Sequence, residues 1–220
     1  MHLWLMTNLA KFALCGGAVG SCSVVAAGYH FLNTHQEIPT VKKTVGDYLR
    51  DEKFSLLSYK DGNSSEWSKV LSKYKSSGED SKFSDLNLDS GEDNSNIFKL
   101  KEKCKAIVEG EFEKGIHDKA KKWCVIPQSI KERMASLSDV ALDYSNEKSK
   151  NTSMDAWKEK IKTYKGNEGL SSNSTWSSVH DEDTKIEAIK KDCKSFLEGE
   201  SRSYDSDFEE KYRKAITWCT

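Results

Sequence analysis

The stretches CKAIVEGE (residues 104–111) and CKSFLEGE (residues 193–200) are nearly the same eight residues, placed 89 positions apart. Three further landmarks recur in the same order. IP occurs at 38–39 and 126–127, W-x6-YK begins at Trp67 and Trp157, and WC occurs at 123–124 and 218–219. Because four landmarks repeat at similar spacing, the sequence predicts a tandem duplication, with copy one at 38–125 and copy two at 126–220.

Both copies carry helical hydrophobic patterns. Apolar residues at i, i+3, i+4 and i+7 form one face of a helix, and such stripes follow both tryptophans and both repeated cysteines. Gly110 and Gly199 come after the cysteine stripes, where a helix is expected to stop. The only prolines, Pro39 and Pro127, stand at the heads of the two copies. The predicted fold is therefore mainly α: an N-terminal membrane helix followed by two copies of a ~90-residue helical module.

Polar stretches separate the predicted helices. Residues 75–96 and 166–183 are rich in Ser, Asp, Asn and Gly, which predicts long, exposed and partly disordered loops. Trp176 lies in the second stretch without a counterpart in copy one, so we interpret it as a candidate contact residue. The segments 54–57 and 140–144 are expected to be short strands or buried extended chain.

The N-terminal segment 1–35 contains an apolar stretch, Phe12–Leu32, with no Asp, Glu, Lys or Arg. As a helix it would be about 31 Å long, enough to cross a hydrocarbon core. Lys11 precedes it and no Lys or Arg follows before Lys42, which predicts that residues 36–220 are extracellular. Two alternatives remain open: a cleaved signal peptide, or a lipoprotein signal with lipidation at Cys22.

Four cysteines belong to the repeated pattern. Cys104 and Cys124 lie on apolar faces of adjacent predicted helices, level with each other if the chain turns near residues 112–115. Cys193 and Cys219 are the corresponding pair in copy two. An external location would permit two disulfides. The alternative is that all four are small buried apolar residues.

The sequence contains no recognisable catalytic, cofactor or metal motif. It has no phosphate-binding loop, nucleophile elbow, HExxH or CxxC. The acidic runs at 92–93 and 180–183 lack EF-hand spacing and are interpreted as solvated loops. A formal net charge of -1 gives no indication of nucleic-acid binding. We therefore predict no enzyme activity, no cofactor and no metal.

The N-terminal apolar segment, the paired W-x6-YK motifs, the helix-borne cysteine and the WCVIP junction (123–127) resemble the multi-copy uncharacterised proteins of haemotropic mycoplasmas. The resemblance implies a membrane-anchored surface protein, held by residues 12–32, with a role in antigenic variation or in contact with a host-cell surface component. It defines no functional residues. The alternatives are a structural membrane protein that self-associates, and an enzyme without known motifs.

Overall fold

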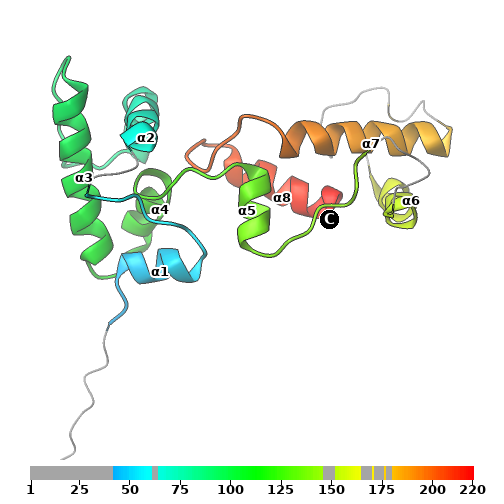
Figure 1. Ribbon diagram of the computed structural model, residues 1–220, viewed down its shortest axis with the longest axis horizontal. Helices are drawn as coiled ribbons and strands as arrows, with labels where there is room; N and C mark the ends of the chain where they lie inside the picture. The colour runs from blue at the N-terminus through cyan, green and yellow to red at the C-terminus, as the bar shows by residue number, and fades with distance from the viewer. Residues whose placement is uncertain (1–41, 61–63, 146–151, 165–169, 171–175, 177–179) are drawn as a thin grey trace, which may run out of the picture. The chain divides into compact units, whose positions relative to one another are not determined.

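The computed structural model describes residues 42–60, 64–145, 152–164, 170, 176 and 180–220 (Figure 1). The described chain is mainly helical, as predicted. Its helices are α1 (Val45–Asp51), α2 (Ser64–Ser76), the short 3-10 helix η1 (Glu79–Ser81), α3 (Asp93–Glu109), α4 (Lys114–Trp123), α5 (Ile130–Ser136), α6 (Met154–Thr163), α7 (Glu182–Leu197) and α8 (Phe208–Cys219). The segments 54–57 and 140–144 are extended chain, and Leu56 forms an isolated bridge with Val125.

The predicted membrane segment Phe12–Leu32 and the candidate lipidation residue Cys22 lie outside the described residues. Within the described part of the chain, no helix combines the length and the apolar character that a bilayer span requires. The membrane assignment therefore stays a prediction from the sequence.

The short helices α1 and α5 both begin with a capping box, a pair of reciprocal hydrogen bonds between a side chain and the backbone. Thr44 caps α1 by accepting a hydrogen bond from the backbone N–H of Asp47, whose carboxylate accepts from the backbone N–H of Thr44. Ser129 and Glu132 form the same reciprocal pair at the start of α5. Such a capping box satisfies two of the N–H groups that every helix start leaves without an intrahelical partner. It explains how helices of only seven residues form at these two places.

The first four helices enclose one hydrophobic core. Helix α3 contacts α1, α2 and α4 (Figure 1). Gly46 permits the close approach of α1, because a Cβ atom there would lie only 2.9 Å from the backbone oxygen of Val108. The stripe predicted from Trp67 is buried as expected. The core residues with the least exposure are Val45, Leu49, Leu57, Trp67, Val70, Leu71, Tyr74, Leu100, Cys104, Ala120, Trp123, Cys124 and Val125.

The last four helices enclose a second core. Helix α7 contacts α6 and α8, and α5 packs against α8. The residues buried in this second core are Ile130, Met134, Trp157, Tyr164, Leu170, Trp176, Ile186, Ile189, Cys193, Leu197, Phe208, Ala215 and Cys219. Helix α3 ends with Gly110 as its C-cap, as predicted, whereas α7 ends at Leu197, two residues before Gly199.

Backbone contacts that close the first core have counterparts in the second. The backbone N–H of Leu57 donates to the oxygen of Cys124 (3.1 Å), and that of Leu142 donates to the oxygen of Cys219 (2.7 Å). Thr44 forms an antiparallel bridge with Glu111, and Ser129 forms one with Arg202. In each half, the start of the first helix is therefore tied to the segment between the last two helices.

Side chains of the repeated motifs also make matching contacts. The indole N–H groups of Trp67 and Trp157 each donate to a backbone oxygen 2.9 Å away, in Ser58 and in Asp143. Both acceptors precede the helix that carries the tryptophan. Each indole therefore buries its rings in the core while its polar N–H group is satisfied at the core's edge.

Contacts also join residues of the two halves within the compact unit Val41–Thr220. The guanidinium of Arg133 lies 3.9 Å from the ring centre of Phe54, and its Nη1 donates to the backbone oxygen of Glu52 at 2.7 Å. Lys73 pairs with Asp205 at 2.7 Å. The hydrogen bond with Asp205 raises the pKa of Lys73, so this ion pair favours the charged lysine.

Candidate functional site

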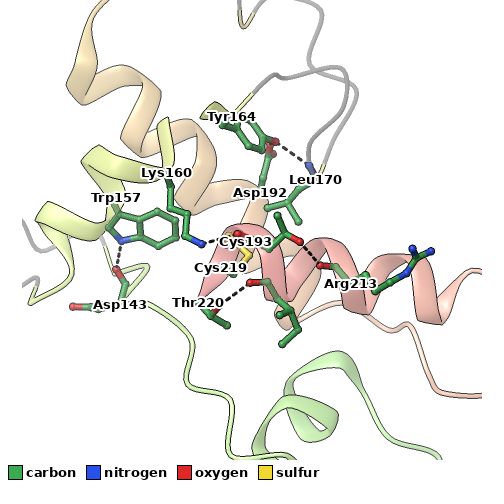
Figure 2. Close-up of a disulfide and its surroundings, with 12 residues drawn as sticks. Asp143, Trp157, Lys160, Tyr164, Leu170, Asp192, Cys193, Arg213, Cys219 and Thr220 are labelled. Atoms are coloured by element: carbon green, nitrogen blue, oxygen red, sulfur yellow. Dashed lines mark hydrogen bonds between the residues drawn. A yellow bond between two sulfur atoms is a disulfide. The ribbon is translucent and has the colours of Figure 1, made fainter. Parts of the chain in front are cut away.

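Two disulfides fasten the last two helices of each half. Cys104 in α3 is bonded to Cys124 after α4, with Cα atoms 5.3 Å apart. Cys193 in α7 is bonded to Cys219 in α8, with Cα atoms 5.6 Å apart (Figure 2). All four cysteine residues are fully buried. A buried disulfide is closed to thiol reagents, so these bonds are structural cross-links rather than exposed redox groups.

The segment between α2 and α3 (residues 77–92, called here the 77–92 loop) is where polar side chains gather. The exposed loop predicted at residues 75–96 is present but shorter, as residues 77–92, and it is ordered rather than partly disordered. Residues 75–76 belong to α2, residues 93–96 belong to α3, and the chain between them contains η1. Composition predicted disorder because the segment has few apolar residues, but side chains of three helices hold its backbone in place.

Tyr74, at the end of α2, anchors the middle of the loop. Its hydroxyl accepts a hydrogen bond from the backbone N–H of Phe83 at 2.9 Å, and the two rings are in contact at 6.0 Å between centres. Burial raises the pKa of Tyr74, which keeps the phenol protonated. From α4, the indole N–H of Trp123 donates to the backbone oxygen of Ser81 (2.6 Å), and Lys119 donates to that of Lys82.

Asn96, in the first turn of α3, anchors the end of the loop. It is fully buried, and its amide accepts from the backbone N–H of Asp89 (2.7 Å) and donates to the backbone oxygen of the same residue (2.8 Å). Lys99 pairs with Asp89, and Lys103 pairs with Asp85. The hydrogen bonds from these lysines lower the pKa of both aspartates.

Two open cavities lie beside the loop. One, of about 390 Å³, lies along α2 and the start of α3. The other, of about 470 Å³, is bounded by the end of α2 and by the loop itself. Lys75 lines both and forms an ion pair with Asp93. Both have the size of small-molecule sites, but they are open to solvent and their lining mixes polar and apolar side chains, which suits side chains of a macromolecular partner better than an enclosed ligand.

The chemistry available at the cavities is hydrogen bonding and charge pairing. The hydroxyls of Ser68 and Ser76 donate to backbone oxygens of their own helix, so they are not held by a general base as a nucleophile would be. Across the described residues, no three His, Cys, Asp or Glu side chains gather where they could hold a metal ion. Of the acidic runs, Asp93 pairs with Lys75, and Asp181 caps α7 by accepting from the backbone N–H of Thr184.

The second half repeats the tyrosine anchor. The Tyr164 hydroxyl accepts from the backbone N–H of Leu170 at 3.0 Å and donates to Asp192 at 3.0 Å (Figure 2). The interpretation of Trp176 as an exposed contact residue is wrong. Trp176 is buried, and its ring meets Tyr164 edge-on with 4.7 Å between centres. A polar neighbourhood in sequence suggested exposure, but the second core supplies an apolar surface for this ring.

From the sequence, Tyr74 was assigned to the apolar stripe of a helix and Asn96 to a polar loop. Their hydrogen bonds to the loop backbone were not predicted. One signal was available for the tyrosine. Both copies keep a Tyr seven residues after the Trp, where any apolar residue would serve a purely hydrophobic face. Asn96 had no such signal, because copy two offers no equivalent motif.

Comparison of the chain with models of protein families, with characterised proteins and with solved structures finds no match. The disulfides, the anchored loop and its cavities are therefore the basis on which a function is proposed.

Proposed function

We propose that the chain is a membrane-anchored surface protein whose helical ectodomain presents the 77–92 loop to an external partner. The observation that carries this proposal is the pair of buried disulfides, one in each half. Disulfides persist in oxidising compartments and are rare where cytosolic thiols keep cysteines reduced. The apolar stretch Phe12–Leu32 supplies the anchor, and the lack of Lys and Arg after it agrees with an external C-terminal region.

We also propose that the ectodomain arose by tandem duplication of one helical module, residues 38–125 and 126–220. Support comes from the contacts that recur at equivalent places: the capping boxes, the disulfides, the tryptophan N–H bonds and the tyrosine anchors. Helices with one polar side need a partner for their apolar stripe, so equal stripes lead to equal packing. The resemblance to surface proteins of haemotropic mycoplasmas agrees with this architecture.

The 77–92 loop is suited to recognition of a protein because its backbone is fixed while its acidic side chains stay in water. Asp85 and Asp89 are more than half exposed, and Glu79 is 88% exposed. A loop ordered before binding loses less conformational entropy when it meets a partner. The partner proposed is a component of the host-cell surface, and the proposal includes no catalytic step.

The topology is tested on intact cells that express the full chain with a C-terminal epitope tag. A protease that cannot cross the membrane should remove the tagged ectodomain from intact cells. A cytoplasmic marker should be degraded only after the cells are lysed. Protection of the tag in sealed cells, together with its cleavage after lysis, would contradict an external location.

The recognition role is tested with the purified ectodomain on host cells. A double variant, Asp85→Ala with Asp89→Ala, removes two exposed charges of the loop. The matched control also removes two exposed acidic side chains, with Glu159→Ala and Glu182→Ala in the second half, each of which pairs with an exposed lysine. Binding should fall for the loop variant and remain for the control. Equal binding of both variants would show that the loop is not the contact.

A further inference from the structure

We propose that the face of the first half formed by Tyr48 and Phe112 rests on the lipid surface, so that α3 holds the 77–92 loop away from the membrane. This inference rests on the proposed membrane anchor. It concerns the start of α1 and the connection between α3 and α4, called here the α1 face. Its occupant is the headgroup layer of the bilayer in which the anchor lies.

The chain length outside the described residues supports this occupant. Residues 33–41 connect the apolar stretch to Lys42. Nine residues reach at most about 32 Å when fully extended, and about 17 Å as a flexible chain. The capping residue Thr44, only two positions after Lys42, therefore lies within reach of this short connection from the apolar stretch.

The aromatic pair lies within about one helical turn of this entry point. Tyr48 follows Thr44 by four residues, which is about 6 Å along a helix. Phe112 follows Glu111, which is bridged to Thr44, so the two rings meet with 4.3 Å between their centres. Tyr48 is 36% exposed and Phe112 44% exposed, whereas most other large aromatics among the described residues are buried, with Phe98 as an exception.

The surroundings of the pair match a headgroup layer. Aromatic side chains favour the membrane–water interface, and lysines reach from it to phosphates with their long stems. Four basic side chains around the pair are each matched by an acidic one, and Glu113 is exposed next to Phe112, so the face carries no excess of positive charge and suits zwitterionic rather than anionic lipids. These ion pairs are Lys42–Glu111, Lys43–Asp51, Arg50–Asp47 and Lys114–Asp118.

This placement orients the first half. Helix α3 runs from Asp93, next to the loop, to Glu109, next to the α1 face, and its 17 residues span about 25 Å. With the α1 face on the lipid, the end of the loop that joins α3 at Asp93 is held roughly that far from the bilayer surface, while Asp85, paired with Lys103, lies nearer to it. The α3 helix also carries a matched control residue. Phe98 is 65% exposed, but it lies on the loop-side half of the helix.

The test uses the full chain reconstituted into phosphatidylcholine vesicles, with a photo-crosslinking residue at one position. The variants are Phe112→p-benzoylphenylalanine, Tyr48→p-benzoylphenylalanine and the control Phe98→p-benzoylphenylalanine. After irradiation, mass spectrometry should find lipid adducts at positions 112 and 48 and none at position 98. Helical circular dichroism and the absence of free thiols at the four ectodomain cysteines show that each variant is folded.

The outcomes separate this inference from the proposed function. If the chain floats with the vesicles and no lipid adduct forms at 112 or 48, the anchor stands and the lipid-facing α1 face is wrong. Adducts to protein at those positions, or equal lipid labelling at 98, would overturn it as well. If the chain does not float, the membrane anchor itself fails and this inference fails with it.

Discussion

Removal of the Cys104–Cys124 disulfide should destabilise the first half by a predictable amount. In the chain-entropy description, the cost grows with the number of residues in the closed loop. A separation of 20 residues corresponds to about 3.3 kcal/mol, and the separation of 26 in the Cys193–Cys219 pair corresponds to about 3.5 kcal/mol. The variant should be Cys104→Ala with Cys124→Ala, because both positions are fully buried and serine would bury a hydroxyl.

Loss of two buried sulfur atoms adds about 1 kcal/mol for the space they leave, so the total expected loss is about 4 kcal/mol. The assay is urea unfolding of the fragment Val41–Thr220 under non-reducing conditions. For each variant, the dependence of the free energy of unfolding on the urea concentration is measured as well. The slope must be measured because the uncrosslinked unfolded chain exposes more surface. The exposed neighbour Lys105 serves as the control, and Lys105→Ala should change the free energy of unfolding by less than about 0.5 kcal/mol. A loss below about 1 kcal/mol for the double variant would show that this cross-link does not restrain the unfolded chain as argued.

Three further predictions concern single side chains. Trp67→Ala should lower the free energy of unfolding by about 3–5 kcal/mol, because the whole indole is buried. Trp67→Phe should lower it less, because phenylalanine keeps most of the apolar contact. Urea unfolding of both variants measures the difference. Tyr74→Phe should lower the free energy of unfolding by about 1–3 kcal/mol, because it leaves the buried N–H of Phe83 without a hydrogen bond. Limited proteolysis of this variant should then cut first within residues 77–92. An unchanged cleavage pattern would show that Tyr74 does not anchor the loop. Burial raises the pKa of Tyr59 and of Tyr212 to about 12. Because unfolded phenols titrate near pH 10, the stability that depends on these two protons is complete below pH 10 and falls as the pH rises from 10 to 12. Part of the phenolate absorbance should therefore appear only above pH 10, together with loss of folded structure, and complete tyrosine titration near pH 10 in a protein that stays folded would contradict this.

Local order in the 77–92 loop follows from contacts that composition does not report. Tyr74, Asn96 and Trp123 each satisfy a backbone group of the loop, and a buried N–H or carbonyl without a partner would be costly. A stretch rich in Ser and Asp can therefore be well ordered when neighbouring helices provide these partners. In the second half, Tyr164 offers the same kind of anchor to Leu170.

The sequence by itself determined the helical character, the approximate helix positions and the residues that face each core. Apolar stripes at helical spacing are a local property, and a stripe such as Trp67–Tyr74 must be buried wherever the helix lies. The same reasoning placed Cys104 opposite Cys124, since both lie on apolar faces of adjacent helices near the turn that joins them.

Only the tertiary structure decided which polar residues anchor the loop, that Trp176 is buried, and that Tyr48 and Phe112 meet at the start of α1. Each of these facts depends on a contact between segments that are separate in sequence. Such contacts depend on how the helices are arranged, and hydrophobic periodicity fixes only which side of each helix is turned inward. The sequence could therefore predict what is buried within each helix, while the partner across the core had to come from the three-dimensional packing.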